Sequence, residues 1–204
     1  MQVKKREIQR KIYDGAVEVF VEKGFLRTTM KDISKKSGVP IGNIYRYYEN
    51  KEVLFDEIVF EIYSNLKYIH IHENLEEINS NYYTKPRNFL NSYITISTSK
   101  PIEFKILLDC SLGTKYENII DELIEIRLKN YDSHIEKIIK ENPQDVDRDF
   151  VSILIGAGTK SIIDICKKYS NNEKLLRYYL MKFDSFFRGG INDKIKKNEI
   201  NYKN

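Results

Sequence analysis

Apolar residues recur along this chain at every third or fourth position, which is the spacing of one face of an α-helix. Near the N-terminus, one such stripe consists of Ile8, Ile12, Ala16, Val19 and Phe20. A second stripe consists of Leu54, Ile58, Ile62 and Leu66. No alternating segment or hairpin dipeptide is long enough to build a sheet. The pattern therefore predicts an all-α fold of about nine helices.

Capping residues set the limits of the first helices. Gly24 is expected to end the first helix. Thr29, followed three residues later by Asp32, fits a capping box and predicts the start of a second helix. Gly38 ends that helix after about two turns.

The remaining helices are placed by proline and polar residues. Pro40 suits the first turn of a third helix, and Asn50 is a good N-cap for a fourth. The fourth helix and the five that follow it are expected near residues 51–70, 85–99, 101–112, 116–141, 145–169 and 172–189. Residues 73–83 fit either a frayed helix end or a loop, and residues 191–204 predict a loose polar tail.

Positive charge is concentrated at the N-terminal end of the chain. Among the 204 residues, 34 are Lys or Arg and 30 are Asp or Glu, so the formal net charge is +4. The first 55 residues contain twelve basic and seven acidic side chains, a net charge of +5, whereas the rest of the chain carries −1. A basic segment on a nearly neutral body is the electrostatic footprint expected for binding of a polyanion.

The composition favours a folded protein in a reducing compartment. Hydrophobic residues make up 41% of the chain, which is enough for a packed core. Cys110 and Cys166 are too few for a disulfide framework and are expected to be buried thiols. The longest apolar run, near residues 153–157, is far shorter than the roughly 20 residues that span a bilayer. With no secretory signal after the basic N-terminus, we expect a cytoplasmic protein without a membrane segment.

Residues 29–48 contain two short helices joined by a tight glycine-containing turn, and a longer helix precedes them. This arrangement is a helix-turn-helix, whose second helix can enter a DNA major groove about 12 Å wide. Ile44 and Tyr48, four residues apart, are expected to face the core, whereas Tyr45 and Arg46 lie on the other side. The pattern indicates a DNA-binding segment, with a helix-turn-helix used only for packing as the alternative.

Four segments of this region also carry a family resemblance. They read Phe20-Val-Glu-Lys-Gly24-Phe25, Thr28-Thr29-Met-Lys-Asp32-Ile33, Ser37-Gly38-Val39 and Gly42-Asn-Ile-Tyr45-Arg-Tyr47-Tyr48-Glu-Asn50-Lys51-Glu52. Residues 8–60 thereby resemble the N-terminal domain of TetR/AcrR-type transcriptional repressors. The resemblance implies a helix-turn-helix domain at residues 1–50, a helical ligand-binding and dimerisation domain at 51–190 and a tail at 191–204. It also implies a homodimer on a palindromic DNA operator, released by a small-molecule effector, with no cofactor and no enzymatic activity.

The resemblance further implies a set of DNA contacts at the matching positions. Those positions are Thr29, Lys31, Ile41, Gly42, Asn43, Tyr45, Arg46, Tyr47 and Lys51. Arg46 would read a base edge, and Lys51, at the start of the fourth helix, would hold a phosphate.

Three positions depart from the family pattern. Pro40 stands where the family often has a Ser N-cap, and the lost cap would cost about 1 kcal/mol if nothing replaced it. Ile41 stands where the family often has Lys, so a charged contact with DNA is missing there. Ser34 replaces a residue that is commonly small and apolar.

Two apolar stripes near the C-terminus are expected to form the dimer interface. They consist of Phe150, Ile153, Leu154, Ala157, Ser161 and Ile165 in one helix, and of Leu176, Tyr179, Leu180, Phe183, Phe186 and Phe187 in the next. The alternative is that these stripes only complete the core of one chain. Because helix-turn-helix proteins commonly read paired half-sites, we expect the dimer.

Residues of the middle helices are candidates for a ligand pocket. They are Tyr93, Ile96, Phe104, Leu108, Cys110, Tyr131 and His134. Each of them also suits a core position, because pockets and cores are both mostly apolar. A tyrosine-rich lining would suit a flat or aromatic ligand.

Other chemistry has weaker support in the sequence. Glu73 and Glu76 fall at helical spacing from His70 and His72, but neither Glu-x-x-His nor His-Glu-x-x-His occurs, so we expect no metal site. Three alternative functions stay open at this point. They are a nucleoid or division protein of the same fold without a ligand, an all-helical enzyme that uses residues 70–76 or 109–110, and a helical module that binds protein.

Overall fold

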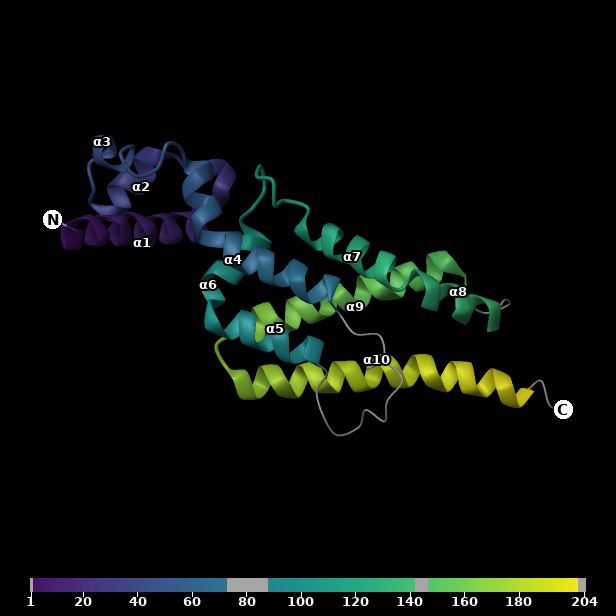
Figure 1. Cartoon of the computed structure of the whole chain (residues 1–204). Helices are drawn as coiled ribbons and strands as arrows, with labels where there is room; N and C mark the ends of the chain where they lie inside the picture. Colours follow the sequence, from purple (N-terminus) through teal and green to yellow (C-terminus); the bar gives the residue numbers. More distant parts are fainter. Residues whose placement is uncertain (1, 73–87, 142–146, 202–204) are drawn as a thin grey trace. The chain divides into compact units, whose positions relative to one another are not determined.

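Helices account for almost all of the structure (Figure 1). It is a computed structural model that describes residues 2–72, 88–141 and 147–201. In these three segments the chain forms ten helices and no strand, which confirms the all-α fold. There is one helix more than expected because a turn at Tyr131 divides the predicted helix 116–141 into α7 (Ile119–Asn130) and α8 (Asp132–Glu141). Residues 73–83 lie outside the described segments.

The helices group into two compact units. Unit 1 comprises Met1–Leu66 and Lys100–Ile119, and unit 2 comprises Lys67–Ser99 and Ile120–Asn204. Both units are thus assembled from two stretches of the chain that are separate in the sequence.

Unit 1 contains more of the chain than the first 50 residues, where the helix-turn-helix domain is expected. Most of α4 (Lys51–Ile71) and all of α6 (Pro101–Asp109) pack with the N-terminal helices. As expected, Asn50 caps α4, because its side-chain oxygen accepts a 2.8 Å hydrogen bond from the Val53 amide. α4 is one continuous helix that contributes residues to both units.

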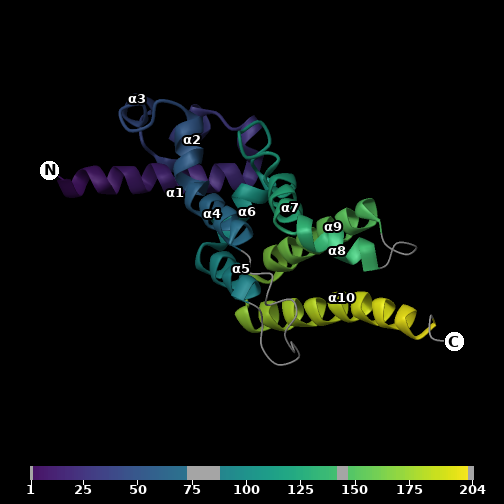
Figure 2. The same ribbon diagram turned by 45° about the vertical axis from the view of Figure 1, so that its right-hand side comes forward.

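α1 (Gln2–Arg27) is the central helix of unit 1 and packs against α2 (Met30–Ser37) and α6 (Figures 1 and 2). Three aromatic rings meet in its core. The ring centroid of Phe55 lies 5.0 Å from that of Phe20 and 5.1 Å from that of Phe25, both in edge-on geometry. Contacts of this kind add about 0.5–1.5 kcal/mol beyond the burial of apolar area.

Two glycines shape α1. A Cβ atom at Gly15 would lie 2.7 Å from Cβ of Ser37, so the absence of a side chain lets α1 and α2 approach closely. Gly24 has a φ of 72° and a ψ of 165°, which interrupts the helix at the residue where the sequence predicts its end. The chain then makes a further turn to Arg27.

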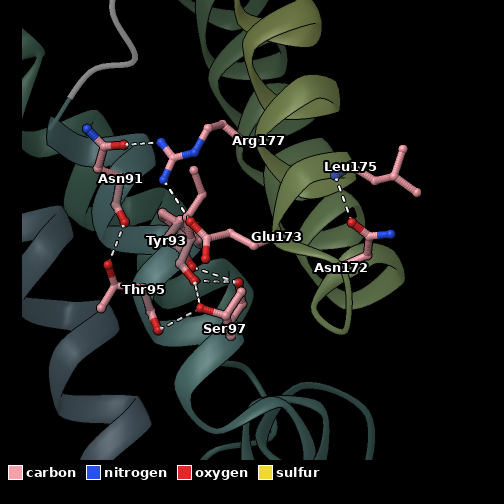
Figure 3. Close-up of polar contacts among 10 residues, drawn as sticks. Asn91, Tyr93, Thr95, Ser97, Asn172, Glu173, Leu175 and Arg177 are labelled. Carbon is pink, nitrogen blue, oxygen red and sulfur yellow. Dashed lines mark hydrogen bonds and ion pairs between the residues drawn. The ribbon is translucent and has the colours of Figure 1, made fainter.

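Unit 2 contains α5 (Asn88–Ser99), α9 (Arg148–Tyr169) and α10 (Glu173–Asn201), which pack against one another. Arg177 donates a 2.9 Å hydrogen bond to Oδ1 of Asn91 and thereby joins α10 to α5 (Figure 3). None of the helices in the described segments has the length and hydrophobicity that a bilayer crossing needs.

The C-terminal end of α10 differs from the expectation. A loose tail from residue 191 is wrong as far as Asn201, because α10 continues through Gly189 and Gly190 without a break. The residues that follow are mostly Lys, Asn, Ile and Glu with no proline, so nothing in this stretch forces the helix to stop.

Candidate nucleic-acid interface

The start of α2 is fixed by the capping box that the sequence predicts. The Asp32 amide donates to Oγ1 of Thr29 at 3.2 Å, and the Thr29 amide donates to Oδ2 of Asp32 at 2.9 Å. Lys23 donates to the other Asp32 oxygen at 2.6 Å. Hydrogen bonds from Lys23 and then from Thr29 lower the pKa of Asp32 to about 2, so this carboxylate stays ionised.

The turn from α2 to α3 (Ile41–Ile44) depends on Gly38. This residue has a φ of 70°, and its amide donates to the Ser34 carbonyl at 3.1 Å. The Ser34 hydroxyl in turn donates to the Val39 carbonyl at 2.7 Å. The polar residue that departs from the family pattern therefore holds the turn in place.

α3 is shorter than the sequence predicts. After its one regular turn, the amides of Arg46 and Tyr47 donate to carbonyls three residues earlier, at 3.2 and 2.9 Å, so the chain tightens instead of continuing as an α-helix. Pro40 is its N-cap and makes no side-chain hydrogen bond, but the Pro40 carbonyl accepts from Asn43 at 2.8 Å.

The two faces of α3 and its following turn separate as predicted. Ile44 and Tyr48 are buried, and the Tyr48 hydroxyl donates to Oε1 of Glu57 in α4 at 2.9 Å. Burial, and then the hydrogen bond to Glu57, raise the pKa of Tyr48, so its hydroxyl remains a donor. Tyr45, which is 52% exposed, and Arg46 point to solvent.

The other predicted DNA contacts have different exposures. Thr29, Lys31 and Gly42 are exposed, whereas Ile41, Asn43 and Tyr47 are half-buried. Thr29 is already engaged in the capping box, so its hydroxyl has a structural role beside any contact with DNA.

Some of the positive charge of unit 1 is paired within the unit, and some is exposed on the helix-turn-helix. Lys36 pairs with Glu18 at 2.8 Å and with Glu22 at 2.9 Å, which neutralises part of the basic excess. By contrast, Lys31 and Arg46 are exposed and make no ion pair with any residue that the structure describes. Their charge is available to a polyanion.

Lys51 has partners that the sequence does not reveal. Its Nζ donates to the carbonyls of Phe25 at 3.0 Å, Thr28 at 3.1 Å and Leu26 at 3.5 Å, and it lies 4.2 Å from the centroid of the Phe25 ring. All three carbonyls belong to the junction between α1 and α2.

The predicted pocket residues do not come together in one unit. Phe104, Leu108 and Cys110 lie on α6 or at its C-cap and belong to unit 1. The members that belong to unit 2 are Tyr93, Ile96 and Tyr131, which are all buried. The side chain of His134 lies outside the described part.

A buried polar cluster surrounds Tyr93 and Tyr131 in unit 2. The Tyr93 hydroxyl lies 2.6 Å from Nε2 of His70, and the Arg127 guanidinium donates to Oγ1 of Thr159 at 2.9 Å. The Arg127 guanidinium carbon lies 5.6 Å from the centroid of the Tyr131 ring. Burial, and then the charge of Arg127, lower the pKa of His70 to about 3, so this imidazole is neutral. Sequence analysis missed Arg127 and Thr159, because only the fold brings them to this position.

No group of metal-ligating side chains is found among the described residues. His70 is fully buried against Tyr93, whereas His72 is exposed and lies against the Tyr68 ring. Glu73 and Glu76 lie outside the described part of the chain. Cys110 and Cys166 are both buried free thiols, and burial raises the pKa of Cys166 to about 12.

The predicted dimer stripes are only partly exposed in the single chain. Phe150, Ile153, Ala157, Tyr179 and Phe186 are exposed, with Ile153 at 67% and Phe186 at 83%. The half-buried members are Leu154, Ser161, Ile165, Phe183 and Phe187.

Two further members of these stripes are fully buried. Leu176 and Leu180 have no exposed surface, so they belong to the core of unit 2 and not to a surface that a second chain could cover. They fall on the inner side of α10, where the apolar pattern alone does not distinguish the core of one chain from an interface.

Comparisons with known proteins agree with the geometry of unit 1. Residues 12–58 match the model of the tetR family of bacterial regulatory proteins. The fatty acid metabolism regulator protein of Bacillus subtilis is 44% identical over 48 residues, which cover 24% of this chain and 25% of that protein. The negative transcriptional regulator IcaR of the biofilm operon icaADBC, from Staphylococcus epidermidis, is 41% identical over 49 residues, which cover 24% and 26%. The match spans about a quarter of the length of these relatives.

A solved structure extends the similarity of the fold. SCO3833 from Streptomyces coelicolor A3, a member of the TetR transcriptional regulator family, aligns over 88% of this chain and 90% of its own. The TM-score is 0.54 and the sequence identity is 15%, so this similarity concerns the fold.

Within the all-helical fold, α2, the turn at Gly38 and α3 form a helix-turn-helix, the arrangement that many DNA-binding proteins use. Residues 12–58 carry the pattern of the tetR family of bacterial regulatory proteins. The resemblance inferred from the sequence is thereby confirmed.

Proposed function

We propose that this protein is a transcriptional regulator that binds a DNA operator through α3 and the turn after it, and that it acts in the cytoplasm. The observation that carries the proposal is the separation of faces in this segment. Ile44 and Tyr48 anchor it to the core, while Tyr45 and Arg46 point outward beside the exposed Lys31. A rigid segment with a basic, aromatic outer face suits a major groove.

The residues on this face would make two kinds of DNA contact, one to base edges and one to phosphates. Arg46 can donate two hydrogen bonds to a guanine, and such a pair discriminates against the wrong base by about 1–3 kcal/mol. Lys31 and the half-buried Tyr47 would contact phosphates, which position the protein without reading the sequence. The apolar Ile41 would contact a base or sugar where the family often has a charged residue.

The regulator is proposed to act as a homodimer. Ile153 and Phe186 leave large apolar side chains exposed on two helices of unit 2, which is unfavourable for a single chain in water. Two copies would place their α3 segments in successive major grooves, about 34–36 Å apart, and would therefore select a palindromic site. Sedimentation of the full chain should give twice the mass of one chain, and Ile153→Lys should reduce that mass; a monomeric parent protein would contradict this part of the proposal.

A small-molecule effector is proposed to act on unit 2. The support is the buried cluster of Tyr93, Tyr131, His70 and Arg127, whose polar groups and rings could orient a ligand. Because α4 contributes to both units, it is the element through which a ligand would change the DNA-binding unit. The ligand must prefer the state that does not bind DNA, and coupling of about 1–3 kcal/mol between the two sites is typical.

Because IcaR is named as a negative regulator, we propose that this protein represses transcription. A thermal-shift screen tests whether a small molecule stabilises the protein. If none does, a DNA-binding protein of the same fold without an effector is favoured.

Selection of random 30-base-pair duplexes on the full-length protein, at two salt concentrations, tests the DNA-binding proposal. One short palindromic sequence that survives the higher salt is expected. Arg46→Ala should relax the preference at one base position of each half-site, while Lys174→Ala, an exposed change in unit 2, should leave the selected sequence unchanged. Recovery of random sequences that are lost at higher salt would leave only electrostatic binding and would contradict the proposal.

A further inference from the structure

The ammonium group of the half-buried Lys51 faces three backbone carbonyls. It donates to the Phe25 carbonyl at 3.0 Å, to the Thr28 carbonyl at 3.1 Å and to the Leu26 carbonyl at 3.5 Å. An ammonium has three protons and no acceptor, so these three carbonyls account for all of its donors. The Phe25 ring, 4.2 Å away at its centroid, provides a further contact for the charge.

These carbonyls lie where the backbone most needs donors. α1 is interrupted at Gly24 and ends at Arg27, so the last carbonyls of its final turn have no partner within the helix. The Phe25 carbonyl also accepts from the Thr28 amide at 3.1 Å, just beyond the end of α1. A positive charge at this end also interacts favourably with the helix dipole. Lys51 supplies both the donors and the charge from the first residue of α4, which is more than twenty residues away in the sequence.

The junction held in this way leads directly into the DNA-binding helices. Thr28 is buried and donates to the Gly24 carbonyl at 2.7 Å, and the next residue, Thr29, caps α2. The Phe25 amide donates to the Cys110 carbonyl at 2.9 Å, so the same turn is also attached to the end of α6. The path from α1 to α2 therefore depends on a few hydrogen bonds, three of which end at one nitrogen.

We infer that Lys51 is a positioning residue, which ties the junction between α1 and α2 to α4 and supports DNA binding through the placement of α2 and α3, and not through a phosphate contact. A phosphate contact would require at least one of the three backbone hydrogen bonds to break. This inference rests on the proposed function only for its effect on DNA affinity; the carbonyl contacts themselves can be tested without DNA.

Lys51→Met and Lys51→Arg distinguish a positioning role, through the backbone carbonyls, from a direct contact with a DNA phosphate. Methionine keeps the length of the chain and removes the donors, so the melting temperature should fall by several degrees and affinity for the selected duplex by about tenfold. The slope of log Kd against log salt concentration should stay unchanged. Lys31→Met is the matched control: its slope should become shallower by about 0.9 with a small change in melting temperature, because Lys31 is exposed.

Arginine keeps the charge, but its planar fork does not suit three carbonyls that converge on one point. Lys51→Arg should therefore also lose affinity and melting temperature. Wild-type affinity of Lys51→Arg, or a shallower salt slope for Lys51→Met, would overturn the inference.

Nuclear magnetic resonance of the ¹⁵N-labelled Nζ group gives a readout that does not require a folded variant. A slowly exchanging Lys51 signal is expected in the free protein, and its position should not change on addition of the duplex. A signal that appears only with DNA, or a coupling to phosphorus, would overturn the inference. If the wild-type protein binds no duplex, the proposed function fails, whereas the signal in the free protein still decides whether the carbonyl contacts exist.

Discussion

The junction between α1 and α2 and the buried cluster around Arg127 both hold polar groups inside the protein, but they do so differently. At the junction, the two threonine hydroxyls bond to neighbours in the sequence, Thr29 with Asp32 and Thr28 with Gly24, and Lys51 is added from a distant position. In the cluster, His70 meets a residue 23 positions away, and Arg127 meets one 32 positions away. Local partners are encoded by short motifs, whereas distant partners depend on the packing of whole helices.

Phe20→Ala should have the largest effect, because it removes the support beneath the junction. Phe20 is fully buried against Phe25 and Phe55, and truncation of such a ring costs about 3–5 kcal/mol. Chemical denaturation of the full chain should show this loss, with reduced hydrogen-exchange protection in α1 and α2. Val21→Ala, at the adjacent exposed position, should change stability by less than about 0.5 kcal/mol. A small effect of Phe20→Ala would mean that the local caps hold the junction without its core.

A pH titration of stability tests the buried cluster around Arg127, which contains His70. His70 has a pKa of about 3 in the folded chain and an ordinary value of 6.5. Between these values the unfolded chain binds the extra proton, so stability rises with pH across this window and falls as the solution is acidified. We expect the free energy of unfolding to be about 2 kcal/mol lower at pH 5 than at pH 7.5 because of this residue.

His70→Gln should remove that component of the pH dependence, since glutamine does not titrate. The matched control is Asn65→Gln, an exposed change in the same helix that adds and removes no titratable group, so it should leave the pH dependence intact. Identical pH dependence in His70→Gln and the parent protein would show that the imidazole is not held neutral by burial.

Thr29→Ala should have the smallest effect of the three, with a loss of about 1 kcal/mol. Its hydroxyl caps α2, and nothing else nearby replaces it. Thr95→Ala, in α5 of unit 2, is a matched control because its exposed hydroxyl only donates to a carbonyl of its own helix. Thermal unfolding should show a lower melting temperature for the first variant and little change for the second. If Thr29→Ala and Thr95→Ala lower the melting temperature equally, the cap of α2 contributes no more stability than an ordinary hydroxyl on a helix.

The same distinction explains what the sequence could predict. The capping box and the buried pair of Ile44 and Tyr48 follow from spacings of three or four residues, and the break at Gly24 follows from the glycine itself. All three features are present. α3 is shorter than predicted because the amides of Arg46 and Tyr47 bond to carbonyls three residues earlier, and the apolar spacing does not distinguish this tighter turn from an α-helix.

Residues that act through distant partners could not be assigned in this way. Lysines are mostly exposed, so the sequence predicts an exposed side chain at Lys51. No local spacing indicates that its hydrogen-bond partners are carbonyls at the end of another helix. Phe104 and Tyr93 share the aromatic character expected of pocket residues and are both buried, but they belong to different units. Apolar character predicts burial but does not specify which core a side chain joins.

Unit 1 is made from two separate stretches of sequence, and this limits how the protein can be recombined. A chimaera that transplants residues 1–66 alone would leave the Phe25 amide without the Cys110 carbonyl, and Tyr13 without Glu103 of α6, to which its hydroxyl donates at 3.0 Å. Residues 1–66 therefore do not contain the whole of unit 1. An engineered hybrid that keeps unit 1 intact has to carry α6 and residues 110–119 from the same parent.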